Sequence, residues 1–228
     1  MFKFLETFGD AEEGTEESYT ASTVSGYACD DMGNVIQKGN GDNHVTMLKG
    51  NVSTEIGELG KNVDISRFFG KIMGAHATEA TNLTLLQWTN KVRGGGDWDL
   101  KDNSKTIFGV AWAFDKEAIK SNPDAQKTSF SFGNTDFKNA ADVGNYHAGY
   151  TGTYAGISYN AQWKGAGMAE MLKNREFGKM LDPKTQLIAP YGDKLTDYKW
   201  NTRGMDAAAR EMHVKGPDLT VARQIDDE

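Results

Sequence analysis

The sequence has little of what marks disulfide-stapled, membrane-spanning or Sec-exported chains. Its 228 residues include one cysteine, Cys29, which excludes an internal disulfide and any CxxC metal site. The longest apolar runs have only a few residues, Gly109 to Phe114 being typical, so we expect no membrane span. The first 18 residues turn acidic after Leu5 and contain no apolar signal-peptide core, so we expect no Sec signal.

Positive charge is also scarce. The chain has 25 Lys and Arg against 32 Asp and Glu, a net charge of −7. Non-specific nucleic-acid binding depends on Lys and Arg that neutralise phosphates, so this composition disfavours a nuclease but leaves room for a local basic groove. Proline is rare at four residues, whereas glycine is abundant at 26. Abundant glycine outside low-complexity sequence indicates close backbone packing or loops that line a substrate.

The order of local patterns predicts an α+β fold, a helix-rich single domain with a small β-rich N-terminal portion. Residues 1–58 comprise an acidic leader and then turn-rich, strand-favouring sequence from Tyr19 to Leu48. We interpret Gly57 to Gly60 as a linker, after which helical periodicity begins and continues through residues 59–216. Residues 217–228 are a polar tail. This division predicts an N-terminal appendage to a separate functional domain.

Apolar spacing predicts helices over residues 65–73, 78–92, 161–174 and 202–213. The apolar run from Ile107 to Phe114 fits either a strand or a buried helix, and residues 129–132 favour an extended conformation. Gly149, Gly152 and Gly156 are spaced to share one helical face. Such a face lets another backbone approach closely.

Three segments concentrate polar residues among glycines and aromatics: Gly94 to Lys101, Ala141 to Gly152 and Pro190 to Trp200. Their order and spacing resemble the bacterial polymorphic toxin type 44 family over roughly residues 60–212. The matching motifs are Trp98-Asp99-Leu100-Lys101, Gly144-Asn145 with Gly149 and Gly152, and Tyr191-Gly192-Asp193 with Asp197 and Trp200. In two departures, Leu100 replaces the usual aromatic and Lys194-Leu195 replaces an acid–proline pair.

This resemblance implies an antibacterial effector that is delivered by a secretion apparatus and neutralised by a cognate immunity protein. Secretion without a Sec signal fits such delivery. The favoured destination is the periplasm of the target cell, with its cytoplasm as the alternative. Family members are often assigned as RNases by prediction, so the resemblance implies a toxin rather than a particular reaction.

The middle segment contains the first catalytic candidates. His147 lies in a polar, glycine-flanked stretch and is a general acid/base candidate, while Asp142 could orient its imidazole. Alternatively, His147 hydrogen-bonds a loop carbonyl. Asp99 and Lys101 point the same way in an extended segment, either for catalysis and substrate binding or as a fixed ion pair. Asn145 is a substrate-donor candidate or a turn residue.

Carboxylates elsewhere extend the candidate set. Asp193 and Asp197 have helical spacing and could join Asp99 in glycoside hydrolysis, although capping the last helix is the commoner use of such residues. Glu79 follows His76 by three residues and is a further acid/base candidate. The aromatic candidates for lining a sugar-binding cleft are Trp98, Tyr191 and Trp200.

The leading hypothesis is an antibacterial toxin that hydrolyses peptidoglycan, with an acid/base pair drawn from His147, Asp99, Asp142, Asp193 and Glu79. The first alternative is a toxin RNase that uses His147 and Lys101, with Asn145 as a donor. A third is a non-enzymatic adaptor for secretion cargo. Four scattered histidines without a CxxC motif give no support for a metal, and we expect no cofactor. The expected partners are an immunity protein, a secretion component, and peptidoglycan or RNA as substrate.

Overall fold

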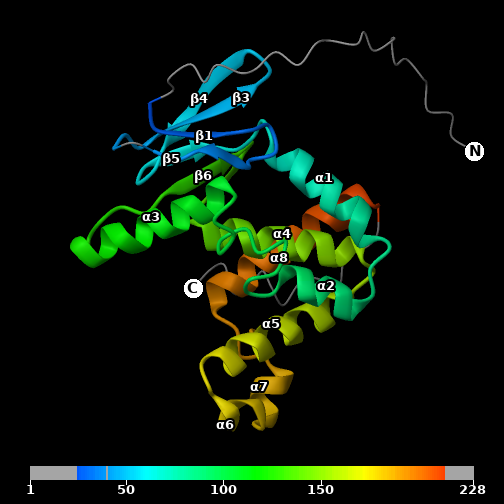
Figure 1. Ribbon diagram of the computed structural model, residues 1–228. Coiled ribbons are helices and arrows are strands. Elements are labelled where there is room, and N and C mark those ends of the chain that lie inside the picture. Colours follow the sequence, from blue (N-terminus) through cyan, green and yellow to red (C-terminus); the bar gives the residue numbers. More distant parts are fainter. Residues whose placement is uncertain (1–24, 40, 214–228) are drawn as a thin grey trace, which may run out of the picture.

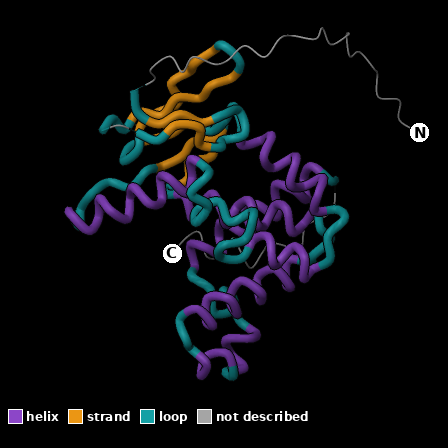
Figure 2. The backbone as a smooth tube through the Cα atoms, viewed as in Figure 1, coloured by secondary structure: helices purple, strands orange, loops and turns teal. Residues whose placement is uncertain are grey.

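The computed structural model describes residues 25–39 and 41–213. The acidic leader, the first residues of the predicted strand region and the polar tail lie outside the described residues. A sheet occupies one end of the described part, and helices make up the rest (Figures 1 and 2). The predicted α+β class, with a β-rich N-terminal portion and a helical remainder, is confirmed.

Seven short strands form one mixed sheet in the order β2-β1-β3-β4-β5-β6-β7. The β1–β3 and β5–β6 pairs are parallel, and the other neighbouring pairs are antiparallel. The strands are β1 Tyr27–Cys29, β2 Val35–Gln37, β3 His44–Lys49, β4 Val52–Glu58, β5 Asn62–Asp64, β6 Ser129–Phe132 and β7 Thr135–Phe137.

The interpretation of Gly57 to Gly60 as a linker is wrong. Gly57 belongs to β4, and the chain turns directly from β4 into β5 as a hairpin. Gly57 has φ +142°, and a Cβ there would lie 2.0 Å from the carbonyl oxygen of Asn62. This glycine is therefore required by the close approach of the paired strands β4 and β5 and does not form a flexible connection. Because β5 also pairs with β6, the sheet continues across the predicted boundary at residue 58.

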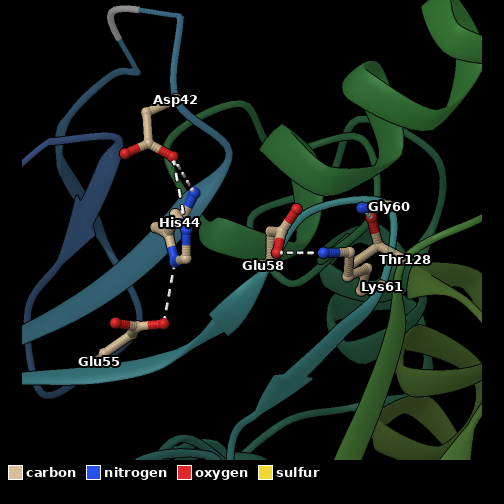
Figure 3. A network of polar contacts seen from close by, with 7 residues as sticks. All are labelled: Asp42, His44, Glu55, Glu58, Gly60, Lys61 and Thr128. Carbon is tan, nitrogen blue, oxygen red and sulfur yellow. Dashed lines mark hydrogen bonds and ion pairs between the residues drawn. The ribbon is translucent and has the colours of Figure 1, made fainter.

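Polar contacts fasten this hairpin to the rest of the sheet (Figure 3). Gly60, in the turn, donates its N–H to Thr128 Oγ1 at 2.8 Å, just before β6. On the neighbouring strands, His44 Nδ1 lies 2.9 Å from Glu55 Oε1. This contact raises the pKa of His44. The contact between Gly60 and Thr128 joins segments nearly 70 residues apart along the chain.

Eight helices follow among the described residues: α1 Phe69–Ala80, α2 Leu85–Val92, α3 Ile107–Ser121, α4 Ala140–Tyr154, α5 Tyr159–Lys173, α6 Phe177–Met180, α7 Pro183–Leu187 and α8 Leu195–Glu211. The predicted single helix over 78–92 is in fact two, because Thr84 and Gln87 form a capping box that starts α2. The ambiguous run from Ile107 is helical, since the Thr106 hydroxyl accepts a hydrogen bond from Gly109 N at the start of α3.

One continuous core joins the sheet to the helices. Phe69 of α1 lies at its centre and packs edge-on against the rings of Phe108, Phe132 and Phe137. Strand residues such as Val45 belong to the same buried cluster. The residues on either side of position 58 therefore share one core, and the proposed functional division at that position stays a prediction.

Helices α4 and α8 cross at the centre of the molecule (Figure 1) with their backbones in contact. A Cβ added to Gly149 of α4 would lie 2.0 Å from the carbonyl oxygen of Asn201, and one added to Gly204 of α8 would lie 1.9 Å from that of Tyr146. No side chain fits at either distance. The predicted close approach at Gly149 is therefore confirmed, and Gly204 supplies its counterpart on α8.

The other two glycines of the predicted face behave differently. A Cβ on Gly152 would meet the side chains of Gln162 and Trp88, not a backbone. Gly156 follows the end of α4 at φ +73°, with open space where a Cβ would be. The predicted backbone contact is wrong for both, because Gly152 faces side chains of α2 and α5 and Gly156 serves the turn after α4.

We predict that Gly149→Ala destabilises the protein by about 2–4 kcal/mol, because the new methyl group forces the two helices apart. Gly144→Ala, on the same helix, is the matched control. A Cβ there meets nothing within 4 Å, so this change should stabilise the helix by up to ~1 kcal/mol. Urea unfolding of both variants measures the difference. Equal stability of the two variants would contradict the close helix contact.

Candidate active-site groove

The three motif segments meet at a groove bordered by α4, α5, α8 and the loop between α2 and α3. We call its larger part the lysine-lined groove, with a volume of about 820 Å³. It is lined by Lys101, Asp102, Trp112, Lys116, Lys127, Lys138, Asn139, Ala141, Asp142, Glu170, Lys173, Lys194, Thr196, Asp197, Lys199, Trp200 and Arg203.

A second hollow of about 470 Å³, the adjoining pocket, shares Lys101, Asp102, Glu170, Lys173 and Asp197 with the groove. It extends between α2 and α5, and its remaining lining residues are Leu85, Trp88, Thr89, Val92, Arg93, Gly94, Asn145, Ala148, Ala161, Gln162, Gly165, Ala166, Ala169, Asp193 and Asn201. The two hollows therefore meet at a shared polar centre.

The first motif and the residue after it contribute Lys101 and Asp102 to this polar centre, on a loop that Asp99 holds in place. Buried Asp99 accepts hydrogen bonds from Gly95 N at 2.8 Å and from Asp102 N at 3.4 Å. This carboxylate lines neither hollow and holds the loop so that Lys101 and Asp102 reach the groove. In the described part of the chain, no ion pair joins Asp99 to Lys101.

The third motif places two carboxylates at the start of α8. Asp193 precedes the helix and accepts a hydrogen bond from Lys194 N at 2.8 Å, and Asp197 lies in the first turn. Burial raises the pKa of Asp193 to about 6, and the negative charges of Asp197 and Glu170 act in the same direction. A carboxyl group of this kind can hold a proton near neutral pH.

Glu170 of α5 faces these carboxylates and was not predicted. Its side chain pairs with Lys194 at 2.8 Å, and the hydrogen bond from this lysine lowers the pKa of Glu170. The same pairing raises the pKa of Lys194. No motif in the sequence marked Glu170, because only the fold of α5 against α8 brings it to the site.

Asp142 of α4 lies on the lysine-lined groove near Asp197. It accepts a hydrogen bond from Lys138 N at 2.9 Å and is hydrogen-bonded to the Trp200 side chain. Burial raises its pKa, and the charge of Asp197 contributes to this shift. Trp200 is 8 % exposed and borders the groove beneath the guanidinium of Arg203, 4.7 Å from the ring centroid.

His147 points away from both hollows. It is fully buried, and its Nε2 lies 2.8 Å from Nδ1 of His76, whose ring stacks on Trp98 at 4.6 Å. Burial lowers the pKa of His147 to about 3 and that of His76 to about 4. The structure does not bring Asp142 to this ring, since the second nitrogen of His147 has no hydrogen-bond partner.

The remaining predicted residues separate into two groups. Glu79 forms an ion pair with Lys91 at 2.8 Å, and Lys91 also lies over the ring of Trp98. Neither Glu79 nor buried Trp98 lines the groove. Tyr191 stacks near Trp163 behind the loop that presents Asp193, whereas Asn145 lines the adjoining pocket.

The lysines are the feature that sequence analysis missed. Eight Lys and Arg line the larger groove against four Asp and Glu, although the whole chain carries −7. These cations come from α3, α5, α8 and the segments before α3, β6, α4 and α8, so no basic stretch reveals them. The groove can attract an anionic substrate.

A family model described as Bacterial toxin 44 matches residues 87–209, more than half of the chain. The chain belongs to the bacterial toxin 44 family. The match spans α2 to α8 and contains all three motif segments and the whole groove, whereas strands β1 to β5 precede it. No curated protein and no solved structure matches this chain.

As a bacterial toxin 44 member, the protein is a toxin effector, and membership implies an immunity partner. Among residues 25–39 and 41–213, no group of three or more His, Cys, Asp or Glu is arranged to hold a metal ion. Within the same residues, no helix has the length and apolar character needed to cross a membrane.

The burial of the two histidines generates a stability prediction. Their pKa values are lower in the folded than in the unfolded chain, so acid should favour unfolding as the pH falls from about 6.5 through 4. His147→Leu keeps most of the volume and removes one titrating group. We expect this variant to fold and to remain toxic. Over that pH range, its free energy of unfolding should fall by about 1 kcal/mol or more less than that of wild type.

Urea unfolding of wild type and variant at pH 7 and pH 4.5 measures this difference. Toxicity on expression in a bacterial host provides the second readout. A well-folded but harmless His147→Leu protein would instead return His147 to the catalytic candidates.

Proposed function

We propose that this toxin hydrolyses peptidoglycan by carboxylate-based acid/base catalysis in the groove. The observation that carries the proposal is Asp193, whose pKa is raised to about 6 beside Asp197, where the three motif segments meet. Glycoside hydrolysis uses two carboxyl groups, one of which must hold a proton near neutral pH. This pair fits that requirement better than the buried histidines do.

In the proposed reaction, protonated Asp193 donates its proton to the glycosidic oxygen as the bond to the leaving sugar breaks. Asp197 takes a proton from the attacking water, and the sugar gains the hydroxyl. Asp99 is a positioning residue that sets the loop carrying Lys101 and Asp102. Asp142 and Trp200 form part of the substrate-binding wall, together with Asn145 in the adjoining pocket.

The charge of the groove suits a cell-wall polymer. Peptidoglycan strands carry peptide carboxylates, which the lysines of the groove can bind at a distance from the reacting carboxyl groups. The proposed site of action is the periplasm of the target cell, after delivery by a secretion apparatus. We propose that a cognate immunity protein and a component of the secretion apparatus complete the set of partners.

The same lysines favour a second candidate function, an RNase acting in the target cytoplasm. Lys and Arg in a groove are what phosphodiester binding requires. In that reading Lys101 and its neighbours hold phosphates, and Asp193 acts as the proton donor in place of His147. The adaptor alternative has less support, because a raised carboxyl pKa at a motif-lined groove is typical of a reactive site.

The raised pKa of Asp193 predicts a pH-dependent effect on stability. The folded protein holds this proton more tightly than the unfolded chain, so the resulting stabilisation is complete below about pH 4 and is lost as the pH rises through 6. Asp193→Asn removes the charge and keeps the oxygen that accepts from Lys194. We expect the free energy of unfolding of the variant to exceed that of wild type by roughly 1–3 kcal/mol at pH 8 and to equal it near pH 4.

Asp136→Asn, an exposed carboxylate on β7, is the matched control and should change stability at neither pH. Urea unfolding at both pH values makes the comparison. If Asp193→Asn has no advantage at pH 8, the carboxyl group is not held in a desolvated site.

Compartment-directed expression tests the function itself. Wild type with an added periplasmic signal should lyse the host, whereas Asp193→Asn should lower release of fragments from purified peptidoglycan by roughly 10²–10⁴-fold. Asp136→Asn should remain as active as wild type. Wild-type activity should fall as the pH rises above about 6, because Asp193 then loses its proton. Killing by the cytoplasmic form alone, with RNA degradation, would favour the RNase instead.

A further inference from the structure

Three side-chain amides at the adjoining pocket each have one buried atom without a hydrogen-bond partner. Among the described residues, five buried side-chain polar atoms have no hydrogen-bond partner, and three of them belong to residues that line this pocket: Asn145 Nδ2, Gln162 Oε1 and Asn201 Oδ1. Asn201 is 6 % exposed and Gln162 is 2 % exposed. Buried polar groups normally have partners, so a cluster without them indicates a place where a ligand completes the hydrogen bonding.

The unpaired atoms include both hydrogen-bonding types. Asn145 has a buried donor and Asn201 a buried acceptor, and rotation of each terminal amide group exchanges the atom that it presents. A secondary amide has one N–H and one C=O and therefore satisfies one donor and one acceptor together. The other amide, Gln162, already donates to Ile157 O at 3.0 Å, so it serves as a fixed part of the wall.

One part of the pocket wall is apolar. It includes Trp88 and Val92 of α2, Ala148 of α4, which packs in the same cluster as they do, and Ala166 of α5. Such a surface accepts a methyl group next to the amide. Asp193 and Asp197 border the same pocket, so a ligand held here lies beside the proposed acid/base pair.

We propose that the adjoining pocket binds the acetamido group of an N-acetylated amino sugar. The Asn145 amide donates to its C=O, the Asn201 amide accepts from its N–H, and the apolar wall holds its methyl group. This proposal rests on the proposed function, because it assigns the bound group to the sugar next to the bond that is cleaved. It concerns binding alone and is therefore tested separately from hydrolysis.

The test is NMR titration of the full chain with N,N′-diacetylchitobiose and with cellobiose, which has hydroxyl groups in place of both acetamido groups. We expect the acetylated disaccharide to bind at least about tenfold more tightly, as two neutral hydrogen bonds and a buried methyl group imply. Asn145→Ala and Asn201→Ala should each lose most of this preference. Asn160→Ala, an exposed asparagine on α5, should keep it.

Equal affinity for the two disaccharides would overturn the inference, and this comparison needs no variant to fold. Undiminished preference in a folded Asn145→Ala protein would also overturn it. Tighter binding of an N-acetylated alanyl peptide than of diacetylchitobiose would assign the pocket to a peptide amide instead. If acetyl preference is found while Asp193→Asn still degrades peptidoglycan, the acid/base assignment fails and the binding site stands.

Discussion

The site depends on a backbone contact between two helices. Gly149 of α4 and Gly204 of α8 each place their Cα against a carbonyl oxygen of the opposite helix, so the axes approach more closely than any pair of side chains would allow. Asp142 and Asn145 project from one helix, and Asp197 and Asn201 from the other. Only at this separation do the four polar residues border one connected hollow.

A similar close contact at a glycine occurs between α5 and the loop before α8. A Cβ on Gly167 of α5 would lie 2.0 Å from the carbonyl oxygen of Tyr191, so the loop carrying Asp193 rests directly on α5. This contact sets Asp193 beside Glu170, whose negative charge contributes to the raised pKa. The close packing of this loop on α5 therefore accompanies the burial that raises the pKa of Asp193.

These relations explain what the sequence could and could not reveal. Lys101, Asn145, Asp193 and Asp197 were predicted because each lies in a motif segment that concentrates polar residues among glycines and aromatics. Glu170 and Asn201 were missed because they follow ordinary helical sequence and gain their roles only through packing. The sequence indicated only part of the mixed sheet. Strand β4 was not predicted, and β5 pairs with β6, which lies more than 60 residues later in the chain.

His147 shows the opposite relation between sequence and position. A histidine among glycines and polar residues reads as a catalytic base when only the sequence is known. On α4, however, that side chain contacts His76 of α1 and Trp98 of the segment between α2 and α3. Helical geometry turns it away from the adjoining pocket that Asn145, two residues earlier, lines.

The net charge of −7 disfavours an anionic substrate, but it is a sum over parts of the chain that differ in charge. The first 18 residues contribute −5 and the last 12 contribute −3, which leaves the intervening 198 residues at +1. The acidic character therefore belongs to the two ends, outside the family match, and not to the matched domain. Within that nearly neutral domain, cations gather on one groove, and the acids facing them are held close enough to perturb one another. The proposed function needs both features, because lysines attract an anionic polymer while burial, not net charge, keeps one carboxyl group protonated.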